Sequence, residues 1–220
     1  MVAKTLVTAD ELAALEDDGY RYELIAGELI RMTPAKPKHG WISARFCAWL
    51  ATFVDLHELG VVLESSAGYQ FEEAPDTVLA PDVSFIHRDR IPPFADWDEY
   101  FRVIPDLVME SQSPSERKRD IERKIRLYLT HGVRLVLWVS TRKRQIIIYA
   151  PGREPRVLRE TDEFDAEDVV PGFRFALADQ LLSPSVAAFV QKMEHQGIAA
   201  VFADGPDLAR RIEEARADGA

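Results

Sequence analysis

The stretch from residue 105 to residue 128 carries the side chains best suited to chemistry. Alternation of apolar residues predicts a strand over 106–112, with Glu110 and Gln112 on one face. A helix is predicted directly after it, because Ser113 precedes a proline and, three residues on, a glutamate, which is the capping-box pattern. A carboxylate near the end of a strand, followed by a basic helix, suits metal-assisted cleavage of a phosphodiester bond.

A second carboxylate, Asp82, follows Pro81 in a strand predicted over 77–86. An isolated carboxylate among β-forming residues is costly to desolvate and needs a partner, and a divalent cation is one such partner. Mg²⁺ and Mn²⁺ prefer oxygen ligands, typically one or two carboxylates with water and substrate phosphate. Asp82 and Glu110 are therefore candidate ligands for Mg²⁺, with Mn²⁺ as a substitute.

The charge is unevenly distributed. The formal net charge is −10, which by itself argues against a nucleic-acid partner. Between Arg117 and Arg144, however, ten Lys or Arg residues face two acidic residues, a local excess of +8. This basic run could contact phosphates. The alternative interpretation is a solvated helix face.

Helices and strands alternate along the chain. A capping box at Thr8 opens a short helix, a hairpin is expected over 21–32 with Gly27 in its turn, and a long amphipathic helix is expected over 39–59. Further strands are expected around 61–71, 134–139, 145–149, 156–158 and 173–176. This order predicts an α/β fold with a central mixed sheet flanked by helices. We expect one domain over 1–195, followed by a peripheral helix or tail over 196–220.

Several classes of protein are disfavoured. No apolar run approaches the roughly 18 to 20 residues needed to span a bilayer, and the first residues lack a signal-peptide core, so we expect a cytoplasmic protein without membrane contact. Neither zinc-ligand spacing nor a glycine-rich phosphate loop is present. The single cysteine, Cys47, lies in the apolar pattern of the long helix and is interpreted as a core residue.

Five segments together resemble the Uma-type restriction endonuclease family, within the PD-(D/E)XK nuclease superfamily. They are 22–30, 81–86, 105–115, the Asp120, Lys124 and Tyr128 stripe, and 132–139 with its Gly-Val and Leu-Trp-Val pieces. The resemblance covers about residues 8 to 150. It implies a restriction-endonuclease-like core with Asp82 and Glu110 as metal ligands. In the wider superfamily an early glutamate often joins the site, and Glu23 holds the matching position.

One departure concerns the lysine of the superfamily's acid-X-lysine tripeptide. Here that position holds Gln112, which can form hydrogen bonds but carries no charge. The resembling family places a lysine on the following helix instead, and Lys124 matches it. The alternative for Lys124 is an ordinary helical ion pair with Asp120.

Two functions follow from these residues. The first is a metal-dependent endonuclease acting on DNA, expected as a homodimer, in which Asp82, Glu110, Lys124 and Gln112 form the catalytic set. The second is a catalytically silent nucleic-acid-binding or assembly module that retains the fold. His39, near the start of the long helix, is interpreted as facing solvent, with approach to phosphate or metal as the alternative.

Overall fold

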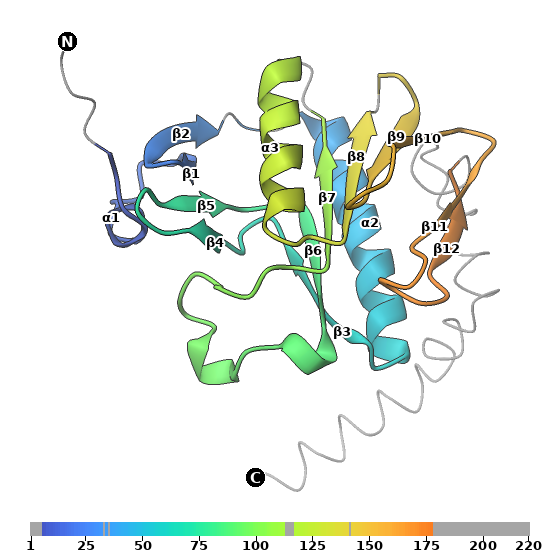
Figure 1. Ribbon diagram of the computed structural model, residues 1–220, viewed down its shortest axis with the longest axis horizontal. Coiled ribbons are helices and arrows are strands. Elements are labelled where there is room, and N and C mark those ends of the chain that lie inside the picture. The colour runs from blue at the N-terminus through green and yellow to red at the C-terminus, as the bar shows by residue number, and fades with distance from the viewer. Residues whose placement is uncertain (1–5, 33, 35, 113–116, 141, 178–220) are drawn as a thin grey trace, which may run out of the picture.

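A six-stranded mixed sheet forms the centre of the protein (Figure 1). The computed structural model describes residues 6–32, 34, 36–112, 117–140 and 142–177. The strand order is β10-β9-β8-β7-β6-β3, in which β7 and β8 pair in parallel and all other neighbours pair antiparallel. The strands are β3 (Gly60–Glu64), β6 (Val83–His87), β7 (Leu107–Ser111), β8 (Leu135–Ser140), β9 (Gln145–Tyr149) and β10 (Arg156–Arg159).

One long helix covers each face of this sheet. Helix α2 (Pro37–Leu56) packs on one face and α3 (Lys118–Thr130) on the other (Figure 1). The alternation in β7 decides which residues meet which helix, because Leu107 and Met109 belong to the α2 core and Val108 to the α3 core. The predicted α/β fold with a flanked mixed sheet is confirmed.

A second, four-stranded sheet lies on the α3 side in the order β2-β1-β5-β4. Its strands are β1 (Arg21–Ile25), β2 (Glu28–Met32), β4 (Tyr69–Glu72) and β5 (Thr77–Leu79). The predicted hairpin is β1–β2, and its two turn residues Ala26 and Gly27 both have positive φ, at 54° and 72°, as a type I′ turn requires. Phe71 and Tyr128 join the sheet to α3 through rings 5.5 Å apart.

Two predicted strands prove to be four. The stretch 77–86 forms β5 and then β6, which belong to different sheets, and the stretch 61–71 likewise divides into β3 and β4. Pro81 lies at the first break, where it cannot donate a ladder hydrogen bond. Asp82 consequently lies where the chain passes from the small sheet to the central one.

Smaller elements complete the described part of the chain. Helix α1 (Ala9–Ala13) begins at the predicted capping box of Thr8 and Glu11. A hairpin of β11 (Glu163–Asp165) and β12 (Arg174–Ala176) packs its phenylalanines against α2, and short 3-10 turns η1 (Arg88–Arg90) and η2 (Phe94–Asp96) lie before β7. None of the described helices is long and apolar enough to cross a bilayer.

The basic helix starts later than its predicted cap. Arg117 is extended at the N-cap of α3 and the helix begins at Lys118. Ser113, the predicted cap, lies outside the described residues, as does the expected tail over 196–220.

Candidate active site

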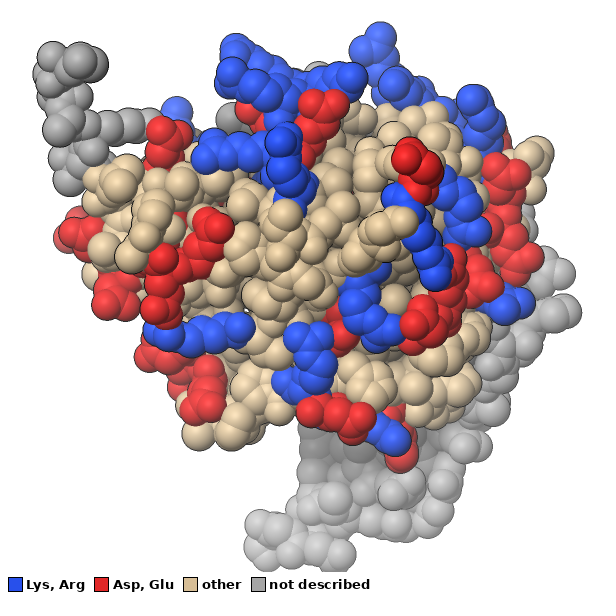
Figure 2. All heavy atoms as spheres, viewed as in Figure 1, with Lys and Arg blue, Asp and Glu red and all other residues tan. Residues whose placement is uncertain are grey.

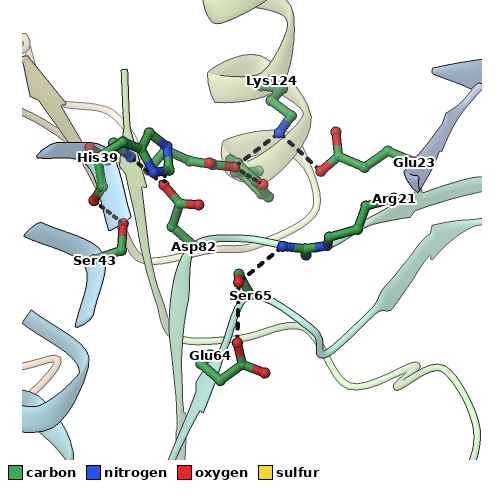
Figure 3. A network of polar contacts seen from close by, with 11 residues as sticks. Arg21, Glu23, His39, Ser43, Glu64, Ser65, Asp82 and Lys124 are labelled. Atoms are coloured by element: carbon green, nitrogen blue, oxygen red, sulfur yellow. Dashed lines mark hydrogen bonds and ion pairs between the residues drawn. The ribbon is translucent and has the colours of Figure 1, made fainter. Parts of the chain in front are cut away.

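A cleft of about 1030 Å³ lies where the two sheets meet the start of α2 and the first turns of α3. Its wall includes polar side chains from five segments, among them Glu23 from β1, His39 from α2, Asp82 from the β5–β6 connection, Glu110 from β7 and Lys124 from α3. Figure 3 shows the side chain of Lys124 directed toward Glu23, and that of His39 directed toward Asp82. The structure therefore brings together the predicted residues Glu23, Asp82, Glu110 and Lys124.

Lys124 joins two of the carboxylates. Its Nζ donates to Oε1 of Glu23 at 3.0 Å and to Oε1 of Glu110 at 3.2 Å, and all three side chains are buried. The predicted alternative, a helical pair with Asp120, is not among the described ion pairs of Lys124, and Asp120 lies beside Arg119 instead. A buried ammonium group requires such partners, so this contact fixes α3 against β1 and β7.

Within the part of the chain that the structure describes, Asp82 is held through one oxygen. Its Oδ2 accepts a hydrogen bond from the backbone N–H of Ser111 at 2.8 Å and lies 3.1 Å from Nε2 of His39. Its Oδ1 makes no hydrogen bond within the described residues. Because Ser111 is the neighbour of Glu110, these contacts place the two predicted metal-binding carboxylates at the same end of β7.

The interpretation that His39 faces solvent is wrong. The first turn of α2 carries it to the carboxylate of Asp82, and its side chain is 18% exposed. Ser43, one turn further along α2, donates its hydroxyl to the backbone oxygen of His39 at 3.2 Å. Sequence reasoning missed this contact because the path of the chain between the hairpin and α2 decides it.

Tyr128 also has a role beyond packing. Its hydroxyl donates to Oε1 of Glu110 at 2.5 Å while its ring packs against Phe71. The signal for this role was present in the sequence, since Tyr128 lies four residues after Lys124 and therefore on the same face of the helix.

Burial and neighbouring charge set the protonation of this cluster. Burial raises the pKa of Glu110 to about 7; the ammonium of Lys124 and the hydroxyl of Tyr128 oppose the rise, and the carboxylates of Asp82 and Glu23 add to it. Burial lowers the pKa of Lys124, but the carboxylates of Glu110 and Glu23 outweigh this effect and raise it, so the ammonium stays charged. With all four groups ionised, the carboxylates of Glu23, Asp82 and Glu110 and the ammonium of Lys124 give this cluster an excess of two negative charges.

The chemistry of these donors fits a hard divalent cation. Carboxylate oxygens are the ligands that Mg²⁺ and Mn²⁺ prefer, and one divalent ion would balance the excess charge. Within the described residues, however, no three His, Cys, Asp or Glu side chains converge closely enough to hold an ion. Asp82 and Glu110 are therefore the protein ligands that the geometry offers, and Glu23 is engaged by Lys124 and by the backbone N–H of Ala80.

Two other residues lie differently from expectation. Gln112 is not among the residues that line the cleft, and its backbone N–H extends the sheet by donating to Val139 at 2.8 Å. Cys47, interpreted as a core residue, is half-buried against the α2 core and also lines the cleft. At that end of the cleft Arg21 donates to Ser65 at 3.0 Å.

Comparison with known proteins identifies the family. Residues 9–178 match the Uma2 family, whose description is "Putative restriction endonuclease". The chain belongs to this family. The resemblance found from the sequence segments is thereby confirmed, and membership in the Uma2 family indicates a restriction-endonuclease-like nuclease with a nucleic acid as substrate.

A solved structure shows the same fold. It is a crystal structure described as "a putative nuclease belonging to DUF820" from Anabaena variabilis, with a TM-score of 0.70 and 20% sequence identity. The similarity covers 79% of this chain and 96% of that one. No curated protein sequence matches the chain.

Proposed function

We propose that this Uma2 protein is a metal-dependent endonuclease that hydrolyses phosphodiester bonds of DNA, with Mg²⁺ as cofactor and Mn²⁺ as a substitute. One observation carries the proposal: Asp82 and Glu110, from separate β-segments, line one cleft and act on each other electrostatically. The contacts that fix them end on Oδ2 of Asp82 and Oε1 of Glu110. Among the residues that the structure describes, this leaves the second oxygen of each carboxylate for a cation.

Each residue of the site has a different role in the proposed reaction. A divalent ion held by Asp82 and Glu110 would lower the pKa of a coordinated water and offset negative charge on the scissile phosphate. Lys124 supplies a positive charge that is already oriented, which stabilises charge developing on phosphate oxygens. Glu23 fixes the ammonium of Lys124, and we retain it as a candidate third ligand if that ion pair rearranges when the cation binds.

The alternative is a catalytically silent module that binds nucleic acid or supports assembly. The position of Gln112 favours it, because this residue replaces the usual lysine and does not line the cleft. The contact between Lys124 and Glu110 favours the endonuclease, because it supplies from α3 the charge that Gln112 lacks.

We also propose the domain organisation, the cellular location and the oligomeric state that the sequence predicts. Residues 1–195 would act as one domain, and the protein would work in the cytoplasm as a homodimer, since cutting both strands of DNA is readily achieved by two copies of one site. Size-exclusion chromatography with light scattering tests the dimer directly.

Plasmid cleavage tests the endonuclease. Supercoiled DNA should be nicked by the wild-type protein in Mg²⁺ or Mn²⁺ and not in EDTA, and Asp82→Asn should lower the rate by about a hundredfold or more. Asp89→Asn is the matched control, since Asp89 is 75% exposed and outside the cleft. Cleavage that survives Asp82→Asn would place the activity elsewhere. Binding of DNA without cleavage in either metal would favour the silent module.

A further inference from the structure

A second hollow, of about 460 Å³, lies along α3 and includes Glu72 of β4 in its wall. Arg119, Arg123 and Arg126 of the helix line it, together with His131, which follows the last helical residue. We call it the α3 groove. Asp120 and Arg123 line both this groove and the cleft, so the two meet at one turn of α3.

The acidic side chains of the α3 groove already have partners. Glu72 accepts a hydrogen bond from Thr77 at 2.9 Å and lies 3.1 Å from Nε2 of His131. Asp120 lies 3.6 Å from Arg119. Arg126 has no carboxylate partner among the described ion pairs, and Arg123 contacts only a backbone oxygen, that of Ile25 at 3.5 Å. Among the described residues the guanidinium groups of Arg123 and Arg126 therefore have no carboxylate partner. The contact of Arg119 with Asp120 is an exposed one, with side chains 84% and 53% exposed, and it holds Arg119 only weakly.

The spacing of the arginines suits a chain of phosphates. Arg119, Arg123 and Arg126 follow at intervals of four and three residues, so they lie along one face of the helix. At about 1.5 Å per residue this stripe extends over about 10 Å. A single phosphate would occupy one end of it, whereas a nucleic-acid strand would present several charges along its length.

We propose that the α3 groove binds the sugar-phosphate backbone of the nucleic acid on one side of the cleavage site and leads that strand into the cleft. This inference rests on the proposed nuclease function, because it assumes that the scissile phosphate binds beside Glu110. It assigns Arg119 and Arg126 to substrate binding and places Arg123 at the entrance to the cleft.

The basic residues of the turn after β8 do not line the α3 groove. Figure 2 shows Lys and Arg side chains gathered along one edge of the molecule, over the start of α3 and over the turn between β8 and β9. Arg142 and Lys143 of that turn line neither hollow, and Arg144 is paired with Glu160. The basic run of the sequence thus divides into residues that line the α3 groove and residues that do not.

This division provides a matched pair of variants. Arg119→Gln/Arg126→Gln and Arg142→Gln/Lys143→Gln each remove two positive charges from exposed side chains. Affinity of the full-length proteins for a fluorescein-labelled duplex of about 20 base pairs, long enough to extend beyond the groove, is measured by fluorescence anisotropy in EDTA at several salt concentrations. Thermal unfolding confirms that both variants fold.

The groove variant should bind DNA roughly tenfold more weakly or worse at about 0.1 M salt and should lose about two units from the slope of log K against log salt. The turn variant should bind within about twofold of the wild type. Equal losses for both variants, no loss for the groove variant, or no binding by the wild-type protein would overturn the proposal. An equal loss of binding to poly-glutamate would show a general anion surface and would also overturn it.

Cleavage assays on the same samples separate this proposal from the proposed function. A wild-type protein that binds DNA through the groove but never cleaves it in Mg²⁺ or Mn²⁺ would refute the nuclease and leave the groove supported. A groove variant that binds and cleaves like the wild type would refute the groove and leave the nuclease supported.

Discussion

Nε2 of His39 lies 3.1 Å from Oδ2 of Asp82 and so adds a side-chain contact to the backbone hydrogen bond from Ser111. Both contacts end on the same carboxylate oxygen. The carboxylate is thereby fixed in rotation, with Oδ1 turned away from its protein partners. His39 is a positioning residue in this arrangement, because it acts on the proposed metal through Asp82.

Replacing His39 should therefore weaken metal binding without unfolding the protein. His39→Ala leaves the Asp82 carboxylate held by one donor, and loss of such an outer contact typically lowers metal affinity by roughly 10- to 100-fold. Calorimetric titration with Mn²⁺ measures the change. His39→Gln should recover part of the affinity, since its amide can donate to the same oxygen. Unchanged Mn²⁺ affinity in His39→Ala would show that His39 does not position Asp82.

Stability without metal should fall as pH rises through neutrality because of Glu110. Burial raises its pKa to about 7, so the neutral form is favoured in the folded protein. The resulting stabilisation is fully present when the pH is below the ordinary pKa of a glutamate side chain. It is lost as the pH rises to about 7 and above. The free energy of unfolding of the wild type, relative to that of Glu110→Gln, should therefore decrease between about pH 5 and pH 8.

Urea denaturation in EDTA at these two pH values measures this difference, because other titrating groups contribute nearly equally to both proteins. Mn²⁺ should reverse the trend in the wild type alone, since the cation competes with the proton for the same carboxylate. A difference that is independent of pH would show that Glu110 is ionised throughout, contrary to its burial beside Asp82 and Glu23.

Removing Lys124 should destabilise the protein strongly. Lys124→Met leaves the buried carboxylates of Glu23 and Glu110 without their shared cation, and breaking a buried ion pair in this way costs about 3–5 kcal/mol. Urea denaturation measures the free energy of unfolding, and cleavage should be lost. The double variant Glu23→Gln/Lys124→Met should lose less stability than the two single losses added together. Strict additivity would contradict the contact between Glu23 and Lys124.

Local patterns in the sequence were sufficient for much of the fold. The capping box at Thr8, the turn at Gly27 and the alternation of Leu107, Val108 and Met109 each determine structure through neighbouring residues, and each prediction is confirmed. The break at Pro81 was missed because β-forming residues continue on both sides of it. The break is visible only in the folded protein, where the residues before Pro81 pair in the small sheet and those after it pair in the central sheet.

The candidate site could be predicted in its residues but not in its contacts. Glu23, Asp82, Glu110 and Lys124 were identified from motifs, yet nothing local indicates that Lys124 reaches Glu23 rather than Asp120. The positions of His39 and Gln112 could not be predicted from neighbouring residues either. The placement of α2 decides the first, and the path of the chain at the end of β7 decides the second. The roles of all these residues in catalysis and metal binding stay predictions.

Glu23 and Lys124 are 101 positions apart in the sequence, yet they share a hydrogen bond inside the site. During synthesis the three carboxylates leave the ribosome before the lysine, since chains emerge from the N-terminus. A chain that ends before α3 has these acids but lacks the cation that pairs with two of them in the folded protein. The buried cluster, and with it the proposed site, can therefore assemble only after α3 has been synthesised.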